Sequence, residues 1–435
     1  MHILIFTDRY VPEIAAPSFR IRDHARHWIE QGHEVTVVTC APNFPHGKVF
    51  PGYKNRFYQE ERIDGVRVIR VKSYMAANVG TLKRMLDYLS FVLWAIFFFW
   101  RYPKFDVIVA TSPPLLVPIA GYAVSRLRRR PWIFEIRDLW PASIEAVGAS
   151  NGRMLNWLKR LEMFLYRKAD RIVSLTGAFK QDLTQRGIPA EKNDVVTNGV
   201  DTEFFSPRNV TLDARKLLGV APEQFLAGYI GTTGMGHDLT TVLGAAELCR
   251  DREDVVFLIM GEGAERVPLE EEARRRGLSN VIFHDFVPQD EVPSYLSAMD
   301  VSIVHLKAHP VFKTVIPSKI FENMAMGVPM VYAVEGISAR IVEEAGAGAC
   351  IPSGDPQAMA RAVLELREDR ARLRQMAKRG PQVVAREYSR RIKAEEMLRS
   401  LNRTLGMPKT AGVKLRLHQC PRTPRQQQKS RRRIS

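Results

Sequence analysis

Cysteine is scarce in this chain: the 435 residues include four cysteines, and no two of them form a CxxC pair. Cys40, Cys249, Cys350 and Cys420 lie far apart, so neither a disulfide scaffold nor a structural zinc site is expected, and a reducing compartment fits best. The sequence has no DxD motif and no His, Cys or carboxylate cluster with metal-ligand spacing, so we expect no bound metal. The first residues, 1–8, lack a basic region and a full apolar run and therefore predict no signal peptide.

Long apolar runs are missing too, since none reaches the roughly 20 residues that a membrane-spanning helix needs. The most apolar stretch is 88–100 (YLSFVLWAIFFFW), which has Lys83 and Arg84 before it and Arg101 and Lys104 after it. Two interpretations stay open: a helix buried in the core of its domain, or a helix that lies in the interface of a membrane. For the second, the candidate lipid contacts are Phe91, Trp94, Phe97, Phe98 and Trp100.

Acidic residues are unevenly distributed, so the formal net charge of +17 is concentrated in two parts of the chain. Residues 1–205 carry 29 Lys and Arg against 20 Asp and Glu, and residues 206–406 carry 26 against 27. Residues 407–435 carry nine basic residues and no acidic one. This asymmetry indicates an anionic partner, either phospholipid or nucleic acid, for the first half and the tail.

Short apolar runs alternate with helical stretches, which is the pattern of a parallel sheet covered on both faces. The predicted strands of the first half are 3–7, 34–39, 66–71, 106–111, 132–136 and 170–175. Those of the second half are 225–230, 255–260, 280–283, 300–304, 329–333 and 349–351. We therefore predict the α/β class, with two facing Rossmann-like, doubly wound domains and a ligand in the cleft outside the carboxyl ends of the strands.

A turn-rich stretch at 198–207 (NGVDTEFFSP) makes a natural linker between the two halves. We expect an N-terminal domain over 1–205 and a C-terminal domain over 206–380. A last helix is expected within 381–406, and 407–435 are expected to form a disordered basic tail.

The sharpest local signal is the segment 316–329 (IPSKIFENMAMGVP). Ser318 is a natural N-cap and Gly327 a natural end, so a short helix is predicted between them. At the cleft, its N-terminus would present free N–H groups, and Lys319 would add a full positive charge that suits an anionic ligand. The carboxylate of Glu322, one turn further, can accept hydrogen bonds from both hydroxyls of a ribose. Two simpler explanations stay open: Lys319 as a solvated surface lysine, and Glu322 as an acid that interacts favourably with the helix dipole.

In their order along the chain, these features resemble those of the large retaining glycosyltransferase family four, which has the GT-B fold. The donor-binding signature of that family is similar to 316–329, and its interdomain passage is similar to 198–207. Further similar segments are 2–7, Pro12-Glu13, Arg20, 32–37, 261–263, 281–287 and 295–304. Residues 135–141 (EIRDLWP), together with Pro317-Ser318-Lys319, resemble a branch that builds bacterial surface polysaccharides such as O-antigen, capsule and colanic acid.

The resemblance implies an enzyme that moves a hexosyl or N-acetylhexosaminyl group from a nucleoside-diphosphate sugar to a lipid-linked glycan acceptor. It implies retention of configuration, no metal and no other cofactor, with acceptor binding by the first domain and donor binding by the second. The implied donor-side residues are Gly231, Thr232, Gly236, His237, Glu262, Phe286, Val287, Thr314, Ser318, Lys319 and Glu322. With the basic first half, it also implies a cytoplasmic enzyme, peripheral on the inner face of the cell membrane, that binds anionic lipid and no nucleic acid.

The chain departs from the family pattern at two donor contacts. Of the frequent Glu-x7-Glu pair, Glu322 fills the second place, but Thr314 stands in the first. The usual Arg-x4-Lys clamp for the diphosphate is replaced by Thr232 and His237. Backbone N–H groups of the loop 231–236 (GTTGMG) and the charge of Lys319 would then compensate the phosphates.

Catalysis of this type needs fixed donors and cations at the leaving diphosphate, a role that falls to Lys319. Asp138, just past a strand end beside Arg137, is expected to orient the acceptor, although a capping role stays open for it. The other acceptor-side candidates are Asp8, Arg9, Arg20 and Arg137.

The residues admit two other functions. Nucleic-acid binding is suggested by 128–130 and 431–433, each three consecutive arginines, but no helix-turn-helix, RRM or zinc-finger pattern accompanies them. A sugar-nucleotide epimerase on the same fold stays open.

Overall fold

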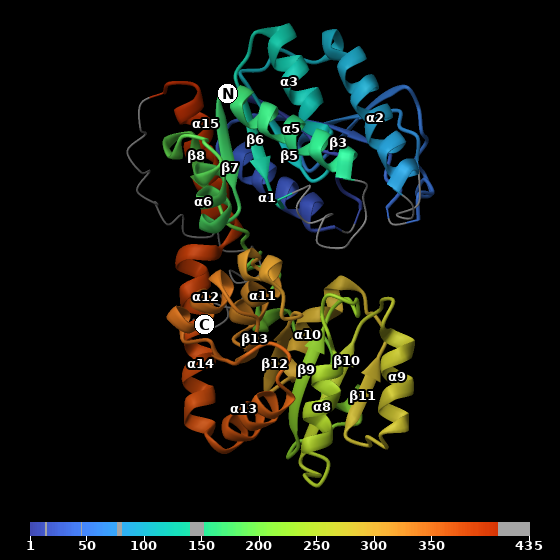
Figure 1. The fold of residues 1–435 in the computed structure, drawn as a ribbon, viewed down its shortest axis with the longest axis vertical. Coiled ribbons are helices and arrows are strands. Elements are labelled where there is room, and N and C mark those ends of the chain that lie inside the picture. Colours follow the sequence, from blue (N-terminus) through green and yellow to red (C-terminus); the bar gives the residue numbers. More distant parts are fainter. Residues whose placement is uncertain (14, 45, 76–80, 140–151, 408–435) are drawn as a thin grey trace, which may run out of the picture.

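The computed structural model describes residues 1–407 apart from residues 14, 45, 76–80 and 140–151. The described residues form two α/β units, one above the other in Figure 1. Both faces of each sheet are covered. In strand β1 (His2–Phe6), for example, Leu4 and Phe6 belong to one hydrophobic cluster, whereas Ile3 and Ile5 belong to another. The predicted fold class, two doubly wound domains, is therefore confirmed.

The first sheet has the strand order β3-β4-β2-β1-β5-β6-β7-β8 and is parallel except for the antiparallel pair β3 and β4. The remaining strands are β2 (Glu34–Cys40), β3 (Tyr58–Ile63), β4 (Val66–Val71), β5 (Val107–Ser112), β6 (Trp132–Ile136), β7 (Arg171–Ser174) and β8 (Asn193–Val195). The helices of this unit are α1 (Ala16–Glu30), α2 (Thr81–Phe97), α3 (Val117–Arg128), α5 (Gly152–Lys168) and α6 (Gly177–Gln185).

The second sheet is parallel throughout, in the order β11-β10-β9-β12-β13-β14. Its strands are β9 (Phe225–Ile230), β10 (Val255–Met260), β11 (Val281–His284), β12 (Val301–His305), β13 (Met330–Ala333) and β14 (Gly348–Cys350). The helices are α7 (Ala214–Leu217), α8 (Thr240–Leu248), α9 (Arg266–Arg275), α10 (Val292–Ala298), α11 (Lys319–Met326), α12 (Ile337–Ala345), α13 (Pro356–Glu368), α14 (Arg370–Val383) and α15 (Arg390–Thr404).

Strand β3 is the element that the pattern of apolar runs does not reveal. Its sequence, YQEERI, is mostly polar because it forms the edge of the sheet and has no fully buried residue. The Asp64-Gly65 turn that joins it to β4 is a hairpin signal from which the strand is predictable.

In each sheet, the strand order reverses beside the first strand. β1 lies between β2 and β5 in the first sheet, and β9 lies between β10 and β12 in the second. Loops diverge at such a reversal and leave a crevice outside the carboxyl ends of the strands. A ligand is therefore expected near Asp8, which follows β1, and near Gly231, which follows β9.

The chain end differs from the predicted single helix within 381–406. Helix α14 continues through Pro381, a π-helical turn spans Val384–Tyr388, and α15 begins after Ser389, whose hydroxyl caps it by accepting the N–H of Ile392. Ser389 has an extended backbone, and this ends the preceding helical segment. The predicted tail lies outside the described residues from 408 onward.

Helix α15 packs back on the first unit, beside β7 and β8 in Figure 1. The indole N–H of Trp28 in α1 donates to the carbonyl of Ala394 at 2.9 Å, and Arg390 pairs with Asp23. The chain passes between the units twice, at 198–207 and again between α14 and α15. These two segments bond each other, since the N–H of Val200 donates to the carbonyl of Tyr388 at 2.9 Å. The second unit is thus tied to the first by two adjacent segments.

Helix α2 has one buried and one exposed face. The buried face agrees with the prediction of a core helix, and the exposed apolar face is the part that could lie in a membrane interface. Phe91 and Phe98 are 2% and 9% exposed in the core, and the prediction that they contact lipid is therefore wrong. Trp94 is half-buried and packs edge to face on Phe57. An apolar stripe faces outward at helical spacing along α2 and the 3₁₀ helix Phe99–Arg101 that follows it: Leu86, Leu89, Leu93, Phe97 and Trp100. No helix within the described ranges is long and apolar enough to cross a membrane.

Candidate functional site

Helix α11 brings Lys319 to the loop that follows β9. Its ammonium Nζ is buried, has no hydrogen-bond partner among the described residues, and lies 3.9 Å from the centroid of the Tyr229 ring. Burial lowers the pKa of Lys319 to about 7, although the nearby carboxylate of Glu322 acts in the opposite direction. Contact with an aromatic face compensates a buried cation only in part, so this ammonium is placed to meet an anion.

The loop after β9 approaches Lys319 so closely that it requires glycine. A Cβ on Gly231, whose φ is +145°, would lie 2.2 Å from Lys319 Nζ. A Cβ on Gly261, the residue after β10, would lie 2.0 Å from the carbonyl oxygen of Gly231. Because neither position has room for a side chain, the backbone of 231–236 itself forms the surface beside the ammonium.

His237 ends this loop, and His305 at the end of β12 holds it in place. Nδ1 of His305 donates to the carbonyl of His237 at 2.7 Å, and its Nε2 accepts the N–H of Gly354 at 3.0 Å, so His305 is neutral. Burial and then the charge of Lys319 lower the pKa of His237 to about 4. Nδ1 of His237 is buried with no partner in the described part of the chain, and the imidazole packs on Tyr229, the ring that Lys319 also contacts.

Ser318 precedes α11 but does not cap it. Its backbone is already helical (φ −60°, ψ −29°), so its hydroxyl accepts no N–H of the first turn and the predicted capping bond is absent. The hydroxyl instead bonds the carboxylate of Glu322, whose pKa is raised by burial against the opposing charges of Lys319 and Arg390. Gly327 ends the helix in a left-handed conformation, as predicted.

A cleft of about 720 Å³ lies between the two units, and on the second unit it reaches Met235 and Gly236, the two residues that precede His237. From the first unit it is lined by residues that follow strand ends, among them Arg137, Asp138 and Thr176. From the second it is lined by residues that include Gly236 and Phe312. The expected interdomain site is therefore present, with the carboxyl ends of both sheets at its walls.

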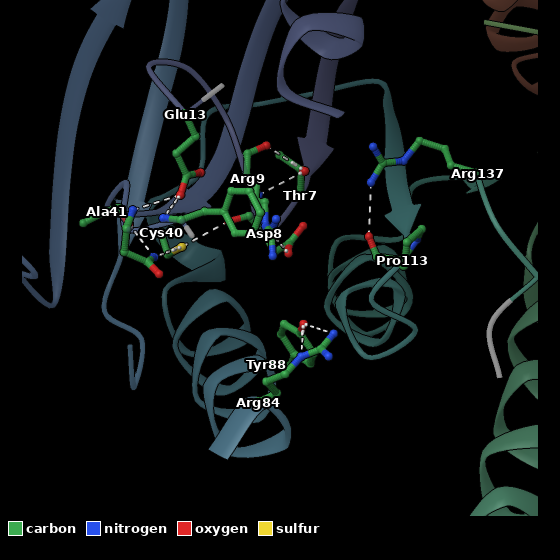
Figure 2. A network of polar contacts seen from close by, with 12 residues as sticks. Thr7, Asp8, Arg9, Glu13, Cys40, Ala41, Arg84, Tyr88, Pro113 and Arg137 are labelled. Atoms are coloured by element: carbon green, nitrogen blue, oxygen red, sulfur yellow. Dashed lines mark hydrogen bonds and ion pairs between the residues drawn. The ribbon is translucent and has the colours of Figure 1, made fainter. Parts of the chain in front are cut away.

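The four predicted acceptor-side residues have different roles. Asp8 and Arg9 pair at 3.4 Å at the end of β1, and Arg137 donates from Nη2 to the carbonyl of Pro113 at 3.1 Å (Figure 2). Burial raises the pKa of Asp8, against the charges of Arg9 and Arg137. Arg20, in contrast, has a structural role. It pairs with buried Glu135 at 3.0 Å and donates to the backbone carbonyls of residues 196 and 197, just before the linker. The prediction that Arg20 faces the acceptor is therefore wrong.

Apart from Gly236, the predicted donor-side residues are not among the residues that line this cleft. Val287 is 6% exposed and belongs to the hydrophobic core of the second unit, so its side chain is not available to a ligand. Glu262 and Thr232 have exposed side chains, and their backbone carbonyls accept hydrogen bonds. The carbonyl of Glu262 accepts from the N–H of Thr233, and that of Thr232 accepts from the hydroxyl of Tyr229. Phe286 is 57% exposed, and Thr314 ends a short 3₁₀ helix, Pro310–Thr314.

Two further functional residues, Tyr229 and His305, carry no local signal in the sequence. Both lie within apolar strand runs, where a ring that contacts Lys319 or orients a loop cannot be distinguished from core. In the described residues, no group of three or more His, Cys, Asp or Glu side chains is placed to hold a metal ion.

Two family models and several known proteins match this chain over most of its length. A glycosyl transferase 4-like domain matches residues 16–199, and the glycosyl transferases group 1 domain matches residues 213–383. WcaI of Escherichia coli (strain K12), which carries the name of a colanic acid biosynthesis glycosyl transferase, is 25% identical over 343 residues, or 77% of this chain and 84% of WcaI.

Solved structures agree on the fold. HepE of Anabaena, in complex with UDP-glucose, superposes with a TM-score of 0.68 at 18% identity over 93% of this chain and 100% of HepE. Sucrose-phosphate synthase of Thermosynechococcus elongatus has a TM-score of 0.73 at 18% identity over 93% of this chain and 99% of that protein. Two facing doubly wound domains with the site between them are those of a GT-B glycosyltransferase. With the two domain matches, this chain belongs to glycosyltransferase family four.

Proposed function

We propose that this enzyme transfers a sugar from a nucleoside-diphosphate sugar to a lipid-linked glycan acceptor in the biosynthesis of a bacterial surface polysaccharide. The observation that carries the donor assignment is the buried Nζ of Lys319, which has no hydrogen-bond partner among the described residues and lies against the backbone of Gly231. Support for the donor class comes from HepE, which binds UDP-glucose, and support for the pathway class comes from the name of WcaI.

The diphosphate of the donor would lie on the loop 231–236, with Lys319 as its full positive charge. A charge-assisted hydrogen bond in a water-excluded site is about twice as strong as a neutral one. Nδ1 of His237 would add a neutral donor, because the pKa of this histidine is low. Glu322, which follows Lys319 by one helical turn, would accept the ribose hydroxyls.

The proposed reaction retains configuration and uses no metal. The bond between the anomeric carbon and the β-phosphate oxygen breaks, and a bond from the acceptor hydroxyl oxygen forms on the same face. The hydroxyl proton passes to the leaving diphosphate. Lys319 stabilises the negative charge that develops on that diphosphate, and Asp138 at the opposite wall of the cleft orients the acceptor.

The outward stripe of α2 supports a peripheral position on the cytoplasmic face of the membrane. Leu93, Phe97 and Trp100 are 66%, 53% and 52% exposed, and Lys83 and Lys104 lie exposed near the two ends of the stripe. An apolar helix face flanked by lysines is suited to the interface of an anionic bilayer.

A calorimetric screen of UDP-glucose, UDP-N-acetylglucosamine and GDP-mannose tests the donor assignment. We expect one of these donors to bind, and Lys319→Met to weaken its binding by about 30- to 150-fold, the equivalent of a charged hydrogen bond of about 2–3 kcal/mol. Lys216→Met, which removes an exposed lysine of α7, is the matched control and leaves binding unchanged. Equal binding by both variants would refute the role of Lys319.

A further inference from the structure

A second, much smaller cavity lies in the first unit, between the loop after β1 and helix α2 (Figure 2). Its volume of about 30 Å³ has room for one or two groups of the size of a water molecule. Two acidic residues from the loop, Asp8 and Glu13, and a third from α2, Asp87, line it together with the basic residues Arg9 and Arg84. The ring of Phe91, which is 2% exposed, closes it on the side of α2.

Glu13 is the most unusual member of this cavity, since it is 1% exposed and half of its carboxylate is unused. Oε1 accepts the backbone N–H groups of Asn43 and Phe44, each at 2.9 Å. Oε2 is buried and has no partner in the described part of the chain. A buried carboxylate oxygen without a donor is costly, so a ligand that brings an O–H group is expected there.

The charges around Glu13 suit a hydroxyl group. A hydroxyl both donates and accepts, and here it finds a carboxylate and a guanidinium side by side. Asp8 pairs with Arg9 at 3.4 Å, and Arg84 donates to the Tyr88 hydroxyl at 3.2 Å. Burial raises the pKa of Glu13, which agrees with the lack of a cation bonded to it. A second carboxylate brought by a ligand would be repelled by Asp8 and Glu13.

The position of the cavity connects it with the two surfaces that the proposed function uses. Asp8 follows β1 and Arg137 follows β6 at the carboxyl edge of the same sheet, and Arg137 lines the interdomain cleft, so the cavity and the cleft lie at the same edge of the first sheet. Tyr88 and Phe91 line the cavity from the inner face of α2, whereas Leu89 and Leu93 lie on its exposed stripe. One helix therefore separates the cavity from the surface proposed to meet lipid.

We propose that this cavity receives the exocyclic hydroxymethyl group of the acceptor sugar, with Glu13 Oε2 accepting its O–H, so that Glu13 determines acceptor specificity. The cavity has room for the two heavy atoms of this group, and Phe91 gives its methylene an apolar contact. The inference rests on the proposed function, because it assumes a glycan acceptor. It predicts that acceptors ending in a hexose are preferred over those ending in a 6-deoxyhexose or a uronic acid.

The test measures binding of three soluble glycosides by calorimetry in the presence of saturating UDP: hexyl β-D-glucoside, its 6-deoxy analogue and hexyl β-D-glucuronide. The glucoside is expected to bind at least tenfold more tightly than either analogue, since each analogue leaves Glu13 without its donor or adds a repelled charge. Glu13→Gln retains an Oε1 for the two N–H groups and replaces the free oxygen by NH₂. It is expected to remove the preference for the glucoside without lowering Tm.

Glu30→Gln, an exposed change on α1, is the matched control and leaves the preference intact. If Glu13 only holds the turn at 43–44, the Gln variant will keep the full preference, and this overturns the proposal. Absence of glucoside binding while UDP still binds also overturns it, and leaves the donor assignment standing. If Glu13→Gln does not fold, Asp8→Asn tests the same cavity: it removes one of the repelling carboxylates, so discrimination against the glucuronide is expected to narrow while the preference over the 6-deoxy analogue stays, and an unchanged discrimination against the glucuronide overturns the proposal.

Discussion

At pH 8, binding of UDP is expected to take up about 0.9 proton per molecule, because Lys319 is mostly neutral in the free enzyme and charged beside a diphosphate. Burial lowers the pKa of Lys319 from 10.5 to about 7 in the free protein. A net shift of this size corresponds to roughly 5 kcal/mol against the charged form, at 1.36 kcal/mol for each pKa unit. An anion in contact with Nζ offsets that cost and raises the pKa again.

The sign of the effect on affinity follows from the same shift. Below pH 7 the lysine is already charged, so affinity does not depend on its titration. Above pH 7 each further pH unit costs about a factor of ten in affinity, until the pH reaches the raised pKa of the complex. For Lys319→Met we expect an affinity that is independent of pH over this range, so the two proteins converge as the pH rises from 7 towards 9.

Calorimetry in buffers of different ionisation enthalpy measures the proton uptake directly. At pH 8 the phosphates of UDP are fully ionised, and the pKa of His237, about 4, is too low for this residue to contribute in the free enzyme. The difference between the wild type and Lys319→Met therefore isolates the lysine. An uptake below 0.2 proton in the wild type, or the same uptake in both proteins, would show that Lys319 does not meet the diphosphate.

Three other changes test separate parts of the structure. Glu322→Gln should weaken UDP binding about tenfold through the ribose and leave pyrophosphate binding unchanged, and an equal loss for both ligands would contradict ribose contact. Arg20→Ala should lower the free energy of unfolding in urea by about 3–5 kcal/mol, because it strands a buried carboxylate, whereas the surface change Arg22→Ala should cost less than about 1 kcal/mol. Replacing Leu93 and Phe97 by serine should reduce sedimentation with anionic vesicles about 30-fold, from roughly 2 kcal/mol of lost apolar burial, with UDP binding retained; undiminished sedimentation would exclude α2 as the contact.

Much of the fold was predictable because its signals are local. A strand buried on both faces must be apolar at nearly every position, as in Val255–Met260, and such runs are recognisable without knowledge of their neighbours. The short helix from Lys319 to Met326 was predictable for the same reason, since Pro317 and Gly327 mark its limits within a few residues. Edge strand β3 lacks an apolar run and was missed, although its turn was informative.

The roles of individual polar residues were much less predictable. Arg20 has the same local appearance whether it meets a substrate or Glu135, which lies 115 positions away. Phe91 and Phe97 both belong to one aromatic run, and only the packing of α2 separates the buried ring from the exposed one. Pro12-Glu13 resembles a family segment, but the cavity at Glu13 could not be predicted, because it is completed by residues of α2, about 70 positions further along the chain.

For this enzyme, the amino-acid order was sufficient to specify two parallel-sheet domains, a linker between them and a cationic helix start suited to a phosphate. Those features depend on hydrophobic periodicity and on helix ends, which act over a few neighbouring residues. The depressed pKa of Lys319, its contact with Tyr229 and the free oxygen of Glu13 depend on chain segments that meet only after folding. Burial and partner atoms set the energy of a charge, and both are properties of the folded neighbourhood rather than of the local sequence.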